Sequence, residues 1–203
     1  MGVINDVQKL TDLSYVNLYQ VKATSIHDTP VVYNVASRAR DVSRLKLKTH
    51  ENKADGVIIY SLYGEKKDRV VLVRQYRYTL DDYIYEFPAG LVEPGEDFRQ
   101  AAIRELKEET GLTLMPIPVD VSYEKPYFTT VGMTDESCAT VYGYASGSVN
   151  KEGQEDSEEI EIVLADRQEV RKILREENVA IMCAYMLMHF LDEKKDPFAF
   201  LNY

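Results

Sequence analysis

The stretch GLVEPGEDFRQAAIRELKEETGL, residues 90–112, is the part of the sequence that decides the fold. Its first half is broken by glycine and proline, which favour a turning loop. From about Asp97 to Thr110 the spacing becomes helical. Glu96 or Asp97 can cap the start of this helix, and Gly111 can cap its end. The stretch therefore predicts a loop, a helix and a second tight turn.

Three glutamates crowd one side of the predicted helix. At 100° per residue, Glu105, Glu108 and Glu109 share an arc of about 100°, close to the helix C-terminus, where the helix dipole disfavours carboxylates. Water can screen such a cluster on an ordinary charged surface, at roughly 0.2–0.5 kcal/mol for each pair. Alternatively, hard divalent cations, which prefer carboxylate oxygens, neutralise the cluster. The helix alone does not decide between these interpretations.

The spacing across the whole stretch favours the second interpretation. Gly90 is followed after five residues by Glu96, and seven further residues lead to RELKEETGL at residues 104–112. This resembles the Nudix box, Gx5Ex7REUxEExGU with U an aliphatic residue, and every specified position is met. Seven fixed identities arise by chance on the order of once in a hundred million windows at ordinary residue frequencies. The sequence is thus similar to the Nudix hydrolases.

The resemblance implies an α/β/α sandwich with a mixed sheet, in which this loop–helix–loop holds Mg²⁺, or Mn²⁺ as a substitute. It also implies hydrolysis of a nucleoside diphosphate linked to another group. Metal ions that bridge diphosphate oxygens and lower the pKa of a bound water would remove two obstacles to this reaction. We expect Arg104 to orient a nearby carboxylate. The candidate metal ligands are Glu105, Glu108, Glu109, Glu96 and the Ala89 carbonyl, the first three also being the candidate catalytic residues.

The rest of the chain predicts strands interleaved with a few helices. Two β-like runs between Tyr15 and Arg40 predict a hairpin or small sheet, and the polar residues 46–55 predict a linker. We therefore expect a small antiparallel β subdomain at residues 1–50 and the hydrolase domain at residues 51–203. Further strands are predicted at GVIIYSLY, VVLVRQYRY, YIYEF, PVDVSYEKPYF, SCATVYGYAS and EIEIVLA, and helices at residues 166–177 and 179–193.

Three features resemble the ADP-ribose pyrophosphatase branch of the family: RQYR at residues 74–77, EFPAG at residues 86–90, and the N-terminal β addition. The likeness implies ADP-ribose as substrate, with AMP and ribose 5-phosphate as products. It also implies a homodimer in which the N-terminal sheet takes part and the substrate site uses both chains. The candidate phosphate-binding residue is Arg77, followed by Arg74, and Arg38 or Arg40 could supply a second basic contact.

Two later segments add candidates to the site. In TTVGMTDE, residues 129–136, Gly132 and Glu136 match the loop of this branch, while Val131 stands where proline is expected. Another sugar nucleotide, a UDP- or GDP-linked hexose, therefore stays the main alternative substrate. In KEGQEDSEEIEI, residues 151–162, Glu158 resembles the further glutamate that ligates metal or acts as general base. The nearby acids Glu155 and Asp156 compete for that role.

Composition narrows the classes of partner. A formal charge of -10 disfavours binding to nucleic acid or to an anionic membrane surface. The two cysteines form no disulfide framework or zinc pattern, which fits a reducing cytoplasm, and no segment predicts a secretory signal or a membrane span. A non-catalytic, ligand-sensing relative is the alternative from another functional class. The complete set of box carboxylates favours an enzyme.

Overall fold

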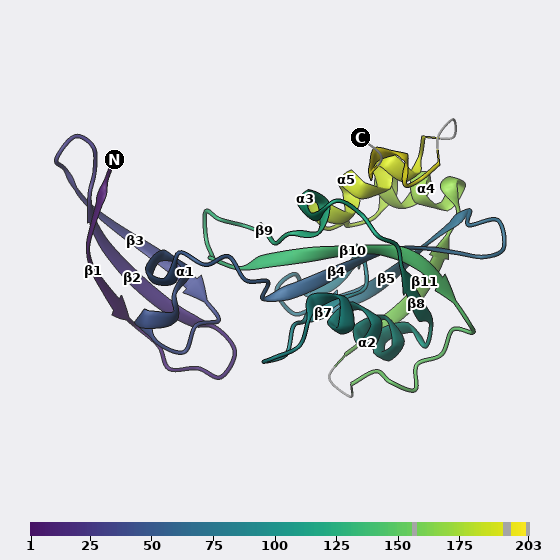
Figure 1. The fold of residues 1–203 in the computed structure, drawn as a ribbon, viewed down its shortest axis with the longest axis horizontal. Coiled ribbons are helices and arrows are strands. Elements are labelled where there is room, and N and C mark those ends of the chain that lie inside the picture. Colours follow the sequence, from purple (N-terminus) through teal and green to yellow (C-terminus); the bar gives the residue numbers. More distant parts are fainter. Residues whose placement is uncertain (156–157, 193–195, 202–203) are drawn as a thin grey trace. The chain divides into compact units, whose positions relative to one another are not determined.

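The structure is a computed structural model that describes residues 1–155, 158–192 and 196–201 (Figure 1). It divides into two compact units. The first contains Met1–Asp55 and Pro126–Cys138, and the second contains Gly56–Lys125 and Ala139–Tyr203. The first unit thus includes a later segment of the chain beside the predicted subdomain at residues 1–50. Within the described residues, no helix combines the length and the apolar character needed to span a membrane.

The first unit is built on a three-stranded antiparallel sheet in the order β1-β2-β3. The strands are β1 (Val3–Lys9), β2 (Asn17–Thr24) and β3 (Pro30–Ser37). The predicted hairpin corresponds to β2 and β3, whereas β1 was not predicted. Its apolar residues are interrupted at Asn5 and Asp6, and its pairing with β2 shifts register between Ile4 and Asp6. Pairing with β2, more than local sequence pattern, therefore defines this strand.

The segment predicted as a polar linker contains a short helix. The 3₁₀ turn η1 (Val42–Arg44) leads into α1 (Lys46–Thr49), which ends at His50 with φ 55°. Lys46 lies largely buried, its ammonium 2.6 Å from the Asp55 carboxylate and bonded to the Ser137 hydroxyl. Burying this ammonium requires such partners. The ion pair fixes the start of α1 inside the first unit.

The second unit is built on a mixed sheet whose main strands have the order β11-β5-β4-β10-β8. The short strands β6 and β7 pair antiparallel with β5 and β4. The strand β10 continues from the first unit, where it pairs with the two-residue strand β9 (Tyr127–Phe128). The strands of the second unit are β4 (Gly56–Tyr63), β5 (Arg69–Arg77), β6 (Asp82–Glu86), β7 (Ala89–Leu91), β8 (Thr113–Pro116), β10 (Ser137–Ser146) and β11 (Ile160–Ala165).

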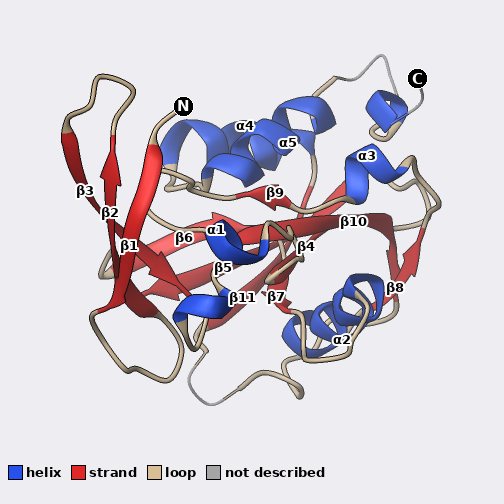
Figure 2. Ribbon diagram, turned by 60° about the vertical axis from the view of Figure 1, so that its left-hand side comes forward, coloured by secondary structure: helices blue, strands red, loops and turns tan. Residues whose placement is uncertain are grey.

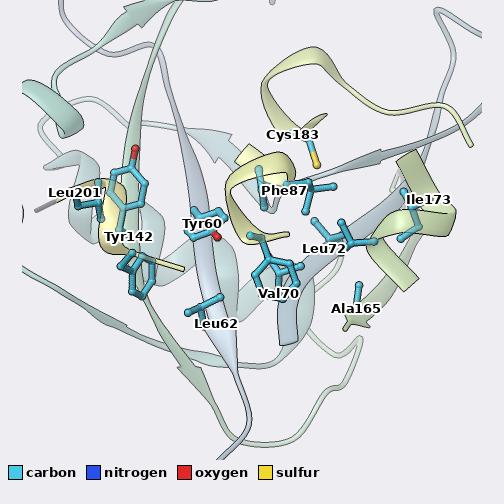
Figure 3. Close-up of a cluster of buried hydrophobic side chains, with 14 residues drawn as sticks. Tyr60, Leu62, Val70, Leu72, Phe87, Tyr142, Ala165, Ile173, Cys183 and Leu201 are labelled. Atoms are coloured by element: carbon cyan, nitrogen blue, oxygen red, sulfur yellow. The ribbon is translucent and has the colours of Figure 1, made fainter. Parts of the chain in front are cut away.

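Apolar side chains cover both faces of this sheet. Successive residues of a strand point to opposite faces, and in β4 Tyr60 and Leu62 enter one core cluster while Val57 and Ile59 enter the other. The first cluster packs against α4 (Arg167–Glu176), α5 (Ile181–Phe190) and η2 (Ala199–Leu201). Figure 3 shows part of it, with Ile173 and Cys183 facing strand residues such as Leu72.

The opposite face of the sheet is covered by the helix α2 (Phe98–Thr110), as Figure 2 shows. Buried Ala101, Ala102 and Leu106 of this helix pack in the second core cluster. The Asp97 carboxylate accepts the Arg99 N–H at 2.9 Å, and Gly111, at φ 74°, ends the helix. The predicted capped helix and the α/β/α sandwich are both confirmed.

Two predicted elements differ from the structure. PVDVSYEKPYF was predicted as a strand, and this is wrong over most of its length. The Asp120 carboxylate caps the short helix α3 (Val121–Glu124), and buried Glu124 forms an ion pair with Arg99 that holds α3 to α2. The strand β8 was not predicted. The helix predicted to end at Glu193 ends at Phe190, and Glu193 itself lies outside the described residues.

Candidate functional site

The C-terminal half of α2 brings its glutamates against the start of β7. Glu109 is almost fully buried, and its carboxylate accepts the Ala89 N–H at 3.2 Å. The Glu105 carboxylate lies directly against Gly90, where an added Cβ would stand 1.9 Å from the carboxyl carbon. A side chain at position 90 would displace the Glu105 carboxylate from this place. The pairing of β7 with β4 therefore carries the Ala89–Gly90 backbone up to two of the candidate ligands.

Arg104 joins three carboxylates of the same stretch. Its guanidinium donates to both oxygens of Glu96, at 3.1 and 2.9 Å, and to Glu105 and Glu108, at 2.8 and 3.0 Å. A further bond reaches the Leu91 carbonyl at 3.0 Å. The planar fork of arginine suits such multiple contacts, and its charge offsets part of the repulsion among the acids. Arg104 thus orients the carboxylates, as the sequence predicted for at least one of them.

The electrostatics of the cluster are dominated by burial. Burial raises the pKa of Glu109 well above its ordinary value, and the charges of Glu158 and Glu105 raise it further, while Arg77 and the Ala89 N–H act in the opposite direction. Burial likewise raises the pKa of Glu105, although Arg104 opposes this shift. Buried carboxylates near one another favour an added positive charge. The site therefore concentrates negative charge around Glu109.

Glu158 acts on this cluster from a different part of the chain. Its negative charge raises the pKa of both Glu105 and Glu109, so the loop before β11 places it in the field of the helix carboxylates. The Glu158 N–H donates to the Glu155 carbonyl at 3.0 Å. Of its two competitors, Glu155 lies exposed beside it, and Asp156 lies outside the described residues.

The two arginines of RQYR point to opposite faces of the sheet. In β5, Val70 and Leu72 face the α4–α5 side, so Arg74 faces that side too, whereas Arg77 faces the α2 side. Arg74 pairs with Glu161 at 3.1 Å and lies over the Tyr83 ring. Arg77 pairs with Glu86 at 2.6 Å. Of the two, Arg77 shares the face of the box glutamates, whereas Arg74, the second candidate, lies on the opposite face.

The remaining predicted substrate residues lie in the first unit. Arg38 pairs with Glu136 at 2.9 Å, and the Gly132 carbonyl accepts the Tyr33 hydroxyl. Arg38 and its alternative Arg40 both line a pocket of about 190 Å³. The complete lining of this pocket is Ser37, Arg38, Ala39, Arg40, Arg44, Lys46, Asp55 and Asp135. This unit therefore has a strongly charged cavity of its own.

The donor chemistry of the second unit fits a divalent cation. Carboxylate and carbonyl oxygens are the ligands that Mg²⁺ prefers, and the buried Glu109 among like charges favours a cation. Yet in the part of the chain that the structure describes, no three acidic, histidine or cysteine side chains already converge on one point suited to a metal ion. Three of the candidate carboxylates are instead turned towards Arg104. The types of residue therefore fit a divalent cation. The carboxylates of Glu96, Glu105 and Glu108 are held in their present orientation by Arg104.

The structure also brings residues to this site that the sequence analysis did not single out. Glu86 accepts a hydrogen bond from Arg77. It belongs to the quoted EFPAG, so the acid two residues before Pro88 could have marked it as a site residue. Gly153 and Gln154 contact the end of α2 from the loop after β10. No motif marks them, because their role depends on where that loop packs.

Comparison with known proteins finds a matching family, similar sequences and a similar fold. The family model for the NUDIX domain matches residues 52–185. A methanol dehydrogenase activator from Bacillus methanolicus is 30% identical over 127 residues, 61% of this chain and 64% of that protein. An ADP-ribose pyrophosphatase from Saccharomyces cerevisiae is 33% identical over 108 residues, 52% of this chain and 43% of that protein. The chain thus spans less than two thirds of the length of these curated relatives.

Among solved structures, the crystal structure of an ADP compounds hydrolase matches with a TM-score of 0.68. The match covers 95% of this chain and 93% of that chain. The sequence identity is 17%, so this likeness concerns the fold alone.

The buried Glu109 carboxylate predicts how the stability of the protein depends on pH, which can be tested in EDTA. Glu109 has a folded pKa well above the ordinary 4.5. Between about 4.5 and that raised pKa, the folded state binds more protons than the unfolded state, so stability falls as pH rises.

Glu109→Gln stays neutral and can still accept the Ala89 N–H. We expect this variant to unfold at a higher temperature than the wild type at pH 8, with a gap that narrows towards pH 4.5. Thermal unfolding measures the gap, and a gap independent of pH would contradict the prediction.

Proposed function

This chain belongs to the Nudix family, and from that premise we propose that it hydrolyses the diphosphate bond of a nucleoside diphosphate sugar with Mg²⁺, or Mn²⁺, as cofactor. The proposed substrate is ADP-ribose, and the products are AMP and ribose 5-phosphate. The observation that carries this proposal is the complete box, folded so that buried Glu109 lies among the charges of Glu105 and Glu158. Such a concentration of hard oxygen donors suits a reaction on a polyanion that needs divalent cations.

In the proposed mechanism, a water oxygen attacks one phosphorus and the bond from that phosphorus to the bridging oxygen breaks. When bound, Mg²⁺ would supply charge neutralisation and lower the pKa of the attacking water. Glu105, Glu108 and Glu109 would hold the ion, together with Glu96 and the Ala89 carbonyl. Arg104 keeps Glu96, Glu105 and Glu108 oriented, which the four carboxylate contacts of its guanidinium support.

The proposed roles of two further residues concern the proton and the phosphate. Glu158 accepts the proton of the attacking water, a role that suits a carboxylate placed within the field of the ligands. Arg77 pairs with a phosphate oxygen, exchanging its present partner Glu86 for the substrate. Arg74 is left out of the proposal because it faces the other side of the sheet.

ADP-ribose as substrate is supported by RQYR, by EFPAG, and by the similarity to the yeast ADP-ribose pyrophosphatase. Gly132 and Glu136 support the same branch, and the Arg38–Glu136 pair shows that these segments meet within the first unit. Val131, in place of the expected proline, favours testing hexose-linked nucleotides as the alternative. A non-catalytic sensing role stays the alternative from another class, because one relative is named an activator.

A substrate panel tests the proposed specificity. The wild type should release AMP from ADP-ribose in Mg²⁺ with a kcat/KM at least about tenfold above that for UDP- or GDP-linked hexoses, which corresponds to about 1.4 kcal/mol of discrimination. Chromatography of the products identifies which bond is cut. A clear preference for a hexose nucleotide would replace ADP-ribose but keep the hydrolase. Tight ligand binding with no hydrolysis in Mg²⁺ or Mn²⁺ would support the sensing role instead.

Removal of one ligand charge tests the proposed metal site. Glu108→Gln should lose most turnover, on the order of a hundredfold or more in kcat, because one anionic oxygen donor is lost without a change of size. The fold should persist, since the Glu108 side chain is nearly half exposed. Glu152→Gln, an exposed acid on another segment, is the matched control. Turnover equal to that of the wild type in Glu108→Gln would remove this residue from the site.

We also propose a homodimer formed through the first unit, in which Arg38 or Arg40 contributes to the substrate site. The small sheet exposes several large apolar residues, more than a solvated surface favours. These include Val3, Ile4, Val31, Val32 and Tyr33.

Light scattering should give twice the mass of the chain for the wild type. Val32→Glu should shift the protein towards the monomer, because it places a charge on this apolar surface. Val121→Glu changes an exposed valine of the second unit and should leave the dimer intact. A monomeric wild type would contradict the dimer and, with it, a substrate site built from two chains.

A further inference from the structure

The segment 150–155 lies on the C-terminal end of α2. The last carbonyls of a helix have no partner within the helix, and donors from elsewhere satisfy them. Here the Asn150 N–H donates to the Thr110 carbonyl at 3.0 Å, and the Gln154 side-chain amide donates to the Glu109 carbonyl at 2.7 Å. The segment is therefore docked on the same helical turn that carries the candidate ligands Glu108 and Glu109.

Gly153 allows this docking to be very close. A Cβ at this position would stand 2.8 Å from the Glu108 Cα and 2.9 Å from its carbonyl oxygen. Distances below 3.0 Å to backbone atoms cannot be relieved by turning a side chain. The backbone of the segment thus rests directly on the backbone of α2, and any side chain at position 153 would push the two apart.

Hydrogen bonds link the end of the docked segment to Glu158. The Glu155 N–H donates to the Glu158 carboxylate at 3.4 Å, and the Glu158 N–H donates to the Glu155 carbonyl at 3.0 Å. Lys151 reaches the Ile160 carbonyl, at the first residue of β11, with its ammonium at 2.5 Å. The position of Glu158 therefore depends on contacts at both ends of the segment, and Gln154 provides the side-chain contact to α2 that lies nearest to Glu158 in the sequence.

We propose that Gln154 and Gly153 are positioning residues for Glu158, holding its segment against the helical turn that carries Glu108 and Glu109. This inference rests on the proposed function and deepens it. The helix and the general base come from distant parts of the chain, so their separation is not fixed by any local motif. Docking through the Glu109 carbonyl ties the base to the backbone of a ligand residue. A small misplacement of a catalytic group costs large factors in rate.

Loss of the amide donor should affect kcat more than KM. Gln154→Ala removes the bond to the Glu109 carbonyl, and Gln154→Glu removes the donor at nearly constant size. Each should lower kcat about tenfold or more, with KM changed less than about twofold, because the phosphate-binding candidate Arg77 lies on β5. Gly153→Ala should have the same effect by pushing the segment away. Glu152→Ala, exposed on the same segment, is the control and should retain the activity of the wild type.

A double-mutant cycle separates positioning from a general structural role. If Gln154 acts through Glu158, then Gln154→Ala should have little further effect on kcat in the Glu158→Gln background. Hydrogen exchange of the amides at residues 150–155 should be faster in Gln154→Ala, with the melting temperature unchanged within about 2 °C.

Three results would overturn the inference: an unchanged kcat in both Gln154 variants, multiplicative effects of Gln154→Ala and Glu158→Gln, or unchanged hydrogen exchange of the segment. Failure of the proposed function is a different observation, because the wild type would then hydrolyse none of the nucleotides tested. In that case the catalytic part of the inference is overturned with it, while hydrogen exchange still decides whether Gln154 docks the segment on α2.

Discussion

The repulsion among the carboxylates on one turn of α2 is the constraint on which the site depends. Glu105, Glu108 and Glu109 share a side of the helix, and burial makes the charge on Glu109 more costly still. The structure answers with Arg104, a backbone N–H from Ala89 and a close approach by Gly90. The contacts of Ala89 and Gly90 require the loop before the helix to return to its C-terminal half. The shape of that loop is thus a consequence of the charge it surrounds.

The sandwich supplies the rigid support that this arrangement needs. α2 lies on one face of the sheet through Ala101, Ala102 and Leu106, while α4 and α5 cover the other face. The strand β4 holds β7 in place, and β5 presents Arg77 on the same face as the helix. The docked segment 150–155 adds a contact from a third part of the chain. Residues far apart in sequence therefore meet around one helical turn.

Much of this could be predicted from the sequence where local chemistry decides the structure. The cap at Asp97, the glycine at Gly111 and the apolar spacing define α2 without help from distant residues. Elements that depend on distant partners were missed or wrongly predicted. The strand β1 needs its pairing with β2, and α3 is held by the ion pair between Arg99 and Glu124.

The same distinction applies to the site. The box glutamates could be predicted because their spacing is itself the motif. The opposite orientation of Arg74 and Arg77 follows from strand alternation once the faces of the sheet are known, but the faces are a property of the fold. Gln154 donates to a backbone carbonyl. Every residue has such a carbonyl, so no residue type in the sequence marks this partner. Arg104, finally, acts as an internal counter-ion for Glu96, Glu105 and Glu108. A cation at the proposed site would compete with this guanidinium, and its apparent affinity would be the difference between two interactions. Occupancy would then follow the free ion concentration of the surroundings.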